Sequence, residues 1–378
     1  MKIEQCQWSA GKGWQPLPTA GSLGTAAQVV ILFGEARLIK QSGCFDAARK
    51  AYPNAHLFGC STAGEIQPGG VEDETIALTA IAFEQTKVAT ARARIESPAR
   101  SFEAGKQLAR QFAPQGLRHV FVLSEGLKVN ASELVNGINS MLPRGVTLSG
   151  GCAGDGSRMQ TTHVWCDGGP EESAVVALGF YGDRLRVGMS AIGGWEPFGP
   201  DRLITRSKQN VLYEIDNGPA LALYKKYLGA YAAELPASGK MFPLELCIGD
   251  QRVLRALIGI NEAEQSITFA GNVPEGVYAR FMIGHVEDLI QGTRLAAKDS
   301  LKNLLAFPSQ LSILVSCCGR RFVLKQRIEE EVEAVREALG SRVMMTGFYS
   351  YGEIAPVRAG GQCELHNETM TITSFSET

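Results

Sequence analysis

Short apolar runs and amphipathic stretches follow one another along most of the chain. The apolar runs are typical of buried strands, and the longer stretches carry apolar residues at helical spacing. Strands are predicted at 29–33, 119–123, 146–150, 311–316, 342–347 and 369–375. Helices are predicted at 44–52, 102–112, 131–142, 219–228, 286–305 and 325–339. Three pairs of strands with short connections are predicted to form hairpins, at 75–83 with 87–95, 173–180 with 184–192, and 253–260 with 266–271.

The order of these elements repeats along the chain. A turn follows the last strand of each repeat: GCSTAGEIQP begins at Gly59, GFYSYGEIAP begins at Gly347, and GGCAGDG at Gly150 is a looser third copy. Internal repetition is a signal of fold. We therefore predict an α/β protein of two related halves, built from repeated hairpin-helix-strand-helix-strand units with mixed sheets. The predicted domains are 25–200 and 201–378, with a boundary in the Gly- and Pro-rich stretch 193–202 or shortly after it.

The first turn has the glycine spacing of a phosphate-binding loop, but Glu65 stands where that loop needs lysine. A carboxylate repels phosphate, so this function is excluded. Each turn should lie at the carboxyl end of a sheet, where α/β proteins place ligands. Two interpretations stay open: the carboxylates fix the turns, or the turns line a ligand cleft. The candidate ligand-binding residues of the turns are Cys60, Ser61, Thr62, Gly64, Glu65, Gly151, Cys152, Asp155, Tyr349 and Glu353.

Arg320 follows another predicted strand and should reach the same edge of the sheet. Its planar guanidinium suits a ligand carboxylate, because the two groups can form paired hydrogen bonds. A salt bridge from Arg320 to Asp155 or Glu353 is an equal alternative.

The segment from Gly59 to Ala63 differs from an esterase nucleophile elbow, because it lacks the last glycine and leads into a strand. No basic residue adjoins Cys60 in the sequence to lower its pKa. An enzyme that uses Cys60 or Glu65 is an alternative, but no catalytic residue is assigned. We expect a ligand-binding protein that is not an enzyme.

Composition narrows the function further. The chain has 378 residues, 45% of them hydrophobic, and a net charge of −2, which suits two globular domains and argues against nucleic acid as a partner. Its nine cysteines show no C-x-x-C pair, so reduced thiols are expected. The sequence shows neither the apolar core of a signal peptide nor an apolar run that could span a membrane. A cytoplasmic protein without a membrane partner is expected.

The five histidines show no spacing typical of a metal site. Haem, however, needs one axial ligand and an apolar pocket. His163 and His285 are the candidate axial ligands, with a hydrogen-bonded structural histidine as the simpler interpretation of each.

Several motifs together resemble the FIST family of sensory domains. They are FGCSTAGEI, LSGGCAGDG, NVPEGVYARFMIG, VSCCGRR, MTGFYSYGEIAP and LHNETMTITSF, and they run from about Val29 to Phe375. The resemblance implies an amino-terminal and a carboxyl-terminal FIST domain and a small ligand. It implies haem as a cofactor for nitric-oxide sensing, as in stand-alone members of similar length, or an amino acid without haem. It also implies signalling in trans to a histidine kinase or to a diguanylate cyclase or phosphodiesterase, and it is compatible with a homodimer.

Overall fold

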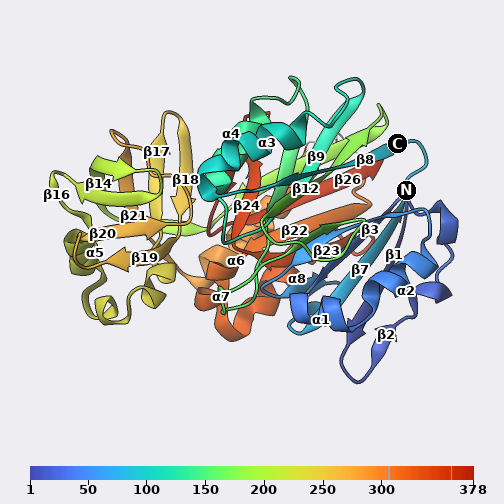
Figure 1. The fold of residues 1–378 in the computed structure, drawn as a ribbon. Coiled ribbons are helices and arrows are strands. Elements are labelled where there is room, and N and C mark those ends of the chain that lie inside the picture. The colour runs from blue at the N-terminus through green and yellow to red at the C-terminus, as the bar shows by residue number, and fades with distance from the viewer. Residues whose placement is uncertain (303, 305–306, 359) are drawn as a thin grey trace.

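The computed structural model describes residues 1–302, 304, 307–358 and 360–378. It contains three α/β units that pack together and a β domain at one end of the molecule (Figure 1). The mixed α/β fold with repeated units is therefore confirmed.

The first unit contains strands β1 (Lys2–Ser9), β3 (Val29–Gly34), β4 (His56–Ser61) and β7 (Thr75–Ala82), with helices α1 (Ala36–Gln41) and α2 (Cys44–Ala51). The second contains β8 (Lys87–Arg94), α3 (Ser101–Ala109), β9 (Leu117–Ser124), α4 (Ala131–Asn139), β10 (Thr147–Cys152) and β12 (Ala174–Tyr181). The third contains β13 (Leu185–Ile192), α6 (Val286–Lys302), β22 (Leu311–Cys317), α7 (Cys318–Leu324), α8 (Ile328–Leu339), β23 (Met344–Ser350) and β26 (Met370–Glu377). Five of the six predicted helices are present at these places, and the one predicted at 219–228 is present as α5 (Ala220–Leu228) in the β domain. Residues 303 and 305, in the predicted last turn of α6, lie outside the described residues.

The three sheets share one strand order. It is β1-β7-β3-β4 in the first unit, β8-β12-β9-β10 in the second and β13-β26-β22-β23 in the third. In each sheet the last two strands of this order are parallel: β3 with β4, β9 with β10, and β22 with β23. The preceding strand of each sheet pairs with the first of these two in the antiparallel direction. The short β2 (Gly13–Gln15) extends the first sheet beyond β1. The repeat seen in the sequence is thus a repeat of topology.

In each unit, the segment after the glycine turn adds one or two strands to the sheet of another unit. The first turn leads into β5 (Glu65–Gln67) and β6 (Gly70–Glu72), and β5 pairs with β23 of the third sheet. The turn after β23 leads into β24 (Gly352–Pro356) and β25 (Cys363–His366), which extend the second sheet through β10. The segment after β10 leads into β11 (Val164–Cys166), which pairs with β4 of the first sheet. The exchange therefore forms a closed ring of three units.

Two of the predicted hairpins are wrong. β7 belongs to the first sheet and β8 to the second, and likewise β12 and β13 lie in different sheets. The reason is that β1 already pairs with β7, and β8 already pairs with β12, on the side that a hairpin partner would need. The short connections at 83–86 and 182–184 therefore carry the chain from one unit to the next. The third predicted hairpin is present as β19 (Leu257–Asn261) with β20 (Ser266–Phe269).

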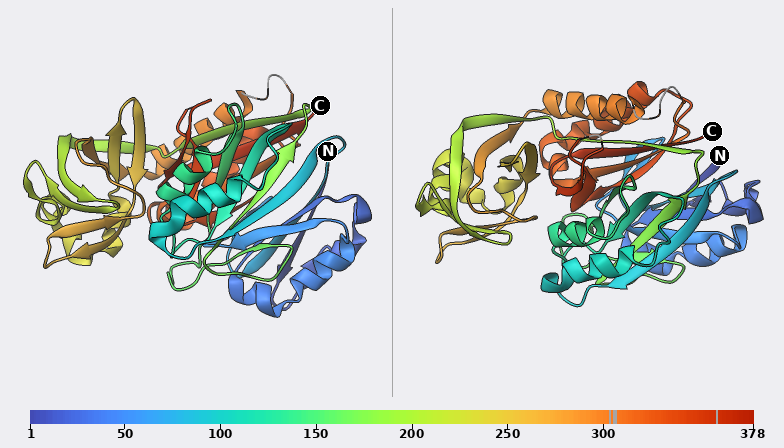
Figure 2. Two further views of the ribbon diagram at one scale, coloured as in Figure 1. Left: turned by 45° about the horizontal axis from the view of Figure 1, so that its top comes forward. Right: turned by 90° about the horizontal axis from the view of Figure 1, so that it is seen from above.

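The three sheets enclose a common core, and the helices lie outside it (Figure 2). The central core takes apolar side chains from every unit, among them Phe33, Phe121 and Phe348. Three outer cores fill the space between each sheet and its own helices. The ring of units therefore shares one interior.

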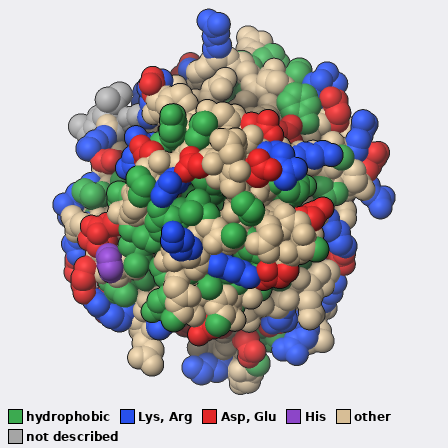
Figure 3. Space-filling view, turned by 90° about the vertical axis from the view of Figure 1, so that its left-hand side faces the viewer, with side chains coloured by type: hydrophobic (Ala, Val, Ile, Leu, Met, Phe, Trp, Pro, Cys, Tyr) green, Lys and Arg blue, Asp and Glu red, His purple; other side chains and the backbone are tan. Residues whose placement is uncertain are grey.

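The β domain is inserted between β13 and α6. It contains β14 (Trp195–Lys208), β15 (Val211–Ile215), β16 (Gly218–Pro219), α5 (Ala220–Leu228), β17 (Leu244–Ile248), β18 (Gln251–Arg255), β19 (Leu257–Asn261), β20 (Ser266–Phe269) and β21 (Tyr278–Gly284). Its core is separate from the others. Its outer face carries apolar side chains among scattered charges (Figure 3). The predicted boundary stretch 193–202 includes the first residues of β14, which pairs with β21.

The helices of the described residues are all too short or too polar to cross a membrane. All nine cysteines are free.

Candidate functional site

The three glycine turns meet at the centre of the ring. The Ala63 N–H donates a hydrogen bond to the Tyr349 carbonyl at 2.8 Å, and the Gly154 N–H donates to the Ser61 carbonyl at 2.9 Å. The Tyr351 N–H donates to the Cys152 carbonyl at 3.2 Å, which closes the circuit. The carboxyl ends of the parallel strands therefore converge on one place, where α/β proteins bind ligands.

Two of the turn carboxylates hold their own turns by the same contacts. Glu65 accepts hydrogen bonds from the hydroxyls of Thr62 and Thr75 and from the Thr75 N–H. Glu353 accepts them from the hydroxyls of Ser350 and Thr369 and from the Thr369 N–H. Burial raises the pKa of each carboxyl to about 8, against the opposing effect of these donors.

Asp155 fixes the segment that follows the second turn. It accepts hydrogen bonds from the backbone N–H groups of residues 159, 160 and 161 and from the Tyr351 hydroxyl. Burial would raise the pKa of Asp155, but these donors favour the carboxylate and lower the pKa below its usual value. The turn-fixing interpretation therefore holds for all three carboxylates.

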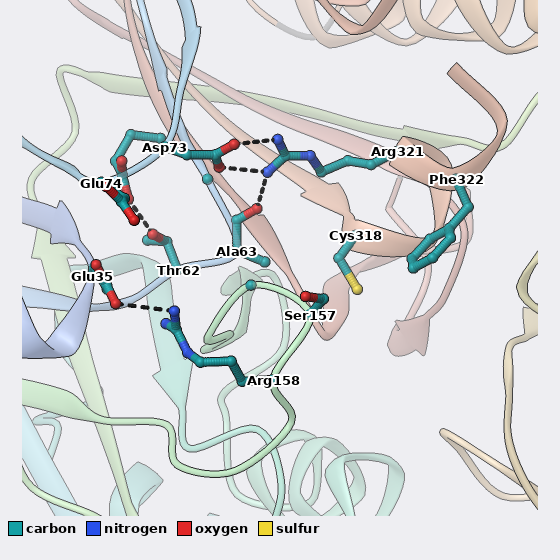
Figure 4. A pocket seen from close by; sticks show the side chains of 13 residues that line it. Glu35, Thr62, Ala63, Asp73, Glu74, Ser157, Arg158, Cys318, Arg321 and Phe322 are labelled. Atoms are coloured by element: carbon teal, nitrogen blue, oxygen red, sulfur yellow. Dashed lines mark hydrogen bonds and ion pairs between the residues drawn. The ribbon is translucent and has the colours of Figure 1, made fainter. Parts of the chain in front are cut away.

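A pocket of about 350 Å³, which we call the central pocket, opens beside the turns. Its walls come from the end of β3, the first turn, the segment between β6 and β7, the loop after the second turn, and α7 (Figure 4). The lining residues are Glu35, Thr62, Ala63, Gly64, Glu65, Asp73, Glu74, Gly156, Ser157, Arg158, Cys318, Arg321 and Phe322. All three units thus contribute to one pocket.

Arg321 closes one side of the central pocket. Its guanidinium binds both carboxylate oxygens of Asp73 at 2.7 Å and also donates to the Ala63 carbonyl (Figure 4). Gly64 has φ +127, and a side chain there would lie 2.4 Å from the guanidinium. The backbone of this turn therefore favours glycine, and a side chain at Gly64 would displace the Arg321 guanidinium.

Glu35 and Arg158 form the opposite side. Arg158 Nη1 lies 3.0 Å from Glu35 Oε1 (Figure 4). Glu35 is 9% exposed, and its Oε2 accepts no hydrogen bond from any residue that the structure describes, although Arg37 Nη2 lies 4.0 Å away. Glu35 and Arg158 also line a second pocket of about 530 Å³, the polar pocket, together with Lys40, Asp155 and His163.

The predicted turn residues divide into two groups. Thr62, Gly64 and Glu65 line the central pocket, and Asp155 lines the polar pocket. The others are buried beneath the turns and line neither pocket: Cys60, Ser61, Gly151, Cys152, Tyr349 and Glu353. Burial raises the pKa of the Cys60 and Cys152 thiols, so neither is an activated nucleophile.

Arg320 does not reach the pockets. It is fully buried and pairs with the equally buried Glu331, whose Oε1 lies 2.6 Å from the arginine Nε. The guanidinium also donates to backbone carbonyls and to the Thr293 hydroxyl. Its ion-pair partner is Glu331, which corrects the expected bridge to Asp155 or Glu353, and the neighbouring Arg321 reaches the pocket instead.

The two candidate histidines lie in different surroundings. His163 Nε2 lies 3.0 Å from Lys40 Nζ, and burial followed by the Lys40 charge lowers the pKa of the imidazole. Its pocket carries charged walls, which do not suit the apolar faces of a haem. His285, in contrast, lines a pocket of about 460 Å³ with several aromatic side chains, among them Phe198, Tyr227 and Phe242. We call this the aromatic pocket.

Some residues of the central pocket could have been predicted from their position directly after a buried strand, but they were not selected from the sequence. Glu35 directly follows the buried strand β3, and Cys318 and Arg321 follow β22, so both segments lie at carboxyl strand ends. Asp73, Glu74 and Arg158 lie in connecting segments whose path depends on the strand exchange. No local pattern could place these three.

Comparison with family models places the chain. A model described as FIST N domain matches residues 28–218, and one described as FIST C domain matches residues 220–356. The chain therefore belongs to the FIST family. FIST domains are small-ligand sensory domains, so the chain has a general sensory role. A comparison with curated proteins finds no match.

Solved structures resemble the chain only distantly. A chorismatase shares 9% identity with a TM-score of 0.35, covering 99% of this chain and 98% of its own. A cyanuric acid hydrolase from A. caulinodans shares 8% with a TM-score of 0.37, covering 100% and 98%. A further cyanuric acid hydrolase shares 9% with a TM-score of 0.33, covering 100% and 99%.

These neighbours are enzymes, and they contradict the expectation that the chain is not an enzyme. We therefore withdraw that expectation. Similarity at this level transfers neither an activity nor a substrate to this chain.

Proposed function

We propose that the chain is a sensor for a small zwitterionic metabolite, of the amino-acid class, that binds in the central and polar pockets. One observation carries the proposal: on the wall that the two pockets share, Glu35 holds a buried carboxylate oxygen that accepts no hydrogen bond from the described residues. A buried acceptor of this kind is costly unless a donor reaches it. A ligand ammonium group is a donor of matching charge.

The same wall offers the opposite charge. Arg158 is 47% exposed along its side chain, and Glu35 is its one ion-pair partner among the residues that the structure describes. Its remaining N–H groups suit a ligand carboxylate. A molecule with both groups would therefore satisfy Glu35 and Arg158 together, whereas an anion alone would leave the Glu35 oxygen without a donor.

The position of the central pocket between the three units suggests how a bound ligand could produce a signal. Its walls belong to three units, so a ligand that binds one arrangement of the units more tightly shifts the population toward it. We propose that the changed surface is read in trans by a histidine kinase or by a diguanylate cyclase or phosphodiesterase in the cytoplasm. A homodimer is compatible with this arrangement.

The test is a thermal-shift and calorimetric screen with the standard amino acids. We expect one or a few of them to bind, and Glu35→Gln to weaken binding roughly 10- to 100-fold, as expected for a hydrogen bond to a charged group. Glu103→Gln, on the outer helix α3, is the matched control and should bind as the unchanged protein does. Failure of every amino acid to bind, or full affinity in Glu35→Gln, would overturn the proposal.

Haem is a second candidate ligand, and the aromatic pocket favours it. His285 could supply an axial imidazole, and the neighbouring aromatic rings suit the faces of the macrocycle. Bound haem iron would supply the site for nitric oxide. The residues around His285 thus fit haem, whereas those around His163 do not.

The absorption spectrum of protein expressed with haem supply tests this candidate. We expect a Soret band that is lost in His285→Ala and kept in His163→Ala. A colourless protein, or a band that survives in His285→Ala, would remove haem from consideration.

A further inference from the structure

A small pocket of about 40 Å³ adjoins the central pocket, and the two share Gly156 and Cys318. Its walls are mostly apolar and come from α7, from the β domain near Ala256 and Ile258, and from the loop at Met159. Two side chains in it have no role in the proposed function. They are the thiol of Cys318 and the carboxyl of Glu368.

Glu368 is fully buried, and neither of its carboxyl oxygens has a hydrogen-bond partner among the described residues. Its backbone has φ +59, which is uncommon for a residue with a side chain. The Trp195 indole and Arg320 hold this backbone, because both donate to the Glu368 carbonyl, at 2.7 Å and 3.3 Å. The fold therefore fixes a strained backbone that directs an unpartnered carboxyl into the small pocket.

The carboxyl lies against the residue next to Cys318. A side chain at Gly319 would place its first carbon 2.0 Å from Glu368 Oε1, so it would displace the Glu368 carboxyl. Burial raises the pKa of Glu368 well above its usual value, which keeps the carboxyl protonated. A hydrogen bond from Cys317 lowers the pKa of Cys318 against the effect of burial, and the Lys240 charge adds to the lowering.

We propose that Cys318 and Glu368 form a covalent binding site for small α,β-unsaturated carbonyl compounds. The thiol faces both pockets, and Figure 4 shows it between Ser157 and Phe322. The apolar small pocket has room for a short carbon chain, and the Glu368 carboxyl can donate to the carbonyl oxygen. The inference goes beyond the proposed function and does not rest on it, because it needs neither Glu35 nor Arg158.

The reaction balances without a further reactant. The Cys318 thiol first releases its proton to water. Its sulfur then bonds to the β-carbon while the electron pair of the C=C bond shifts toward the carbonyl oxygen. Glu368 gives its proton to the resulting enolate and regains one from water. The net change is the addition of S–H across the double bond, with nothing oxidised or expelled.

Acrylamide and iodoacetamide provide a paired test on the full chain, followed by peptide mass spectrometry of native protein. We expect acrylamide to modify Cys318 fastest among the nine cysteines. Glu368→Gln should slow that reaction on the order of 100-fold, the usual scale of general acid catalysis. Iodoacetamide, which expels iodide and needs no proton donor, should label Cys318 in Glu368→Gln at nearly the unchanged rate.

The two reagents separate proton donation from access. Equal slowing of both in Glu368→Gln would overturn the proposal, because the variant would then have closed the pocket. Slow labelling of Cys318 by both reagents in the unchanged protein would also overturn it. Cys247→Ala is the matched control and should keep the Glu368 dependence, since Cys247 lines neither the central pocket nor the small pocket.

Discussion

Glu65 and Glu353 have pKa values of about 8 in the folded protein, so each binds a proton that the unfolded chain has already lost above its ordinary value of 4.5. The free energy of unfolding should therefore fall as pH rises from about 4.5 to 8, by up to about 1.4 kcal/mol per pH unit for each group. Glu65→Gln removes one titrating group, so the free energy of unfolding of this variant should fall less between pH 4.5 and 8 than that of the unchanged protein. Urea unfolding at several pH values measures this.

Glu103→Gln should keep the full slope in that experiment, because this carboxyl lies on the outer surface of α3. Gln at position 65 resembles the protonated acid, so the variant should gain most over the unchanged protein near pH 8. A variant that is weaker by the same amount at every pH would mean that Glu65 is ionised in the folded state.

The Arg320–Glu331 pair gives a second prediction for single residues. Both side chains are 0% exposed, so Arg320→Met should leave a buried carboxylate uncompensated and cost about 3–5 kcal/mol of unfolding free energy. Removing both charges in Arg320→Met with Glu331→Leu should recover most of that loss. Chemical denaturation of the single and double variants measures the difference; a double variant as weak as the single one would contradict the argument.

At the level of single residues, the sequence could place only part of the site. The repeat marks the turn residues Thr62, Gly64 and Glu65, which line the central pocket. Arg320 and Arg321 both follow β22, and their positions after this strand do not show which of them reaches the pocket. The helix α7 settles this choice, since it directs one arginine into the interior and its neighbour toward the pocket. A single sequence does not contain that orientation.

At the level of elements, the first glycine of each repeat allows two parallel strands to approach. A side chain at Gly59 would lie 1.8 Å from the Leu32 carbonyl, and one at Gly347 would lie 2.1 Å from the Leu314 carbonyl. Gly347→Ala should therefore cost about 1–3 kcal/mol or more, as overpacking of a core does. Gly69→Ala is the control, because no atom of the described part of the chain lies within 4 Å of its added carbon. Equal melting temperatures of the two variants would contradict this explanation.

Element types were predictable from periodicity, but strand partners were not. β7 and β8 are short, close in sequence and rich in strand-forming residues, which favours a hairpin. β7 instead pairs with β1 and β3 in the first unit, and β8 pairs with β12 in the second unit. Long-range packing within two different units therefore sets the partners of β7 and β8. β1 was missed as well, because its polar sequence lacks the apolar run of a central strand.

At the level of the whole molecule, the β domain is an insertion with its own core. Its buried cluster is made from residues 204–281, and β14 and β21 bring its two ends together. A fragment of residues 195–284 should therefore fold alone and unfold cooperatively, as separate domains do. Circular dichroism and urea unfolding of the fragment would measure this. A fragment without strand signal would show that the domain depends on the ring.

The ring of exchanged strands also has a consequence for synthesis of the chain. β5 is synthesised early, but its partner β23 ends at Ser350, so β5 cannot pair until almost the entire chain has been synthesised. At a synthesis rate of about 5–20 residues per second, roughly 15–60 s pass between the synthesis of β5 and that of β23. During that time the edge of β5 is open to wrong partners. The nascent chain should therefore depend on chaperones while it leaves the ribosome, even if the finished protein is stable.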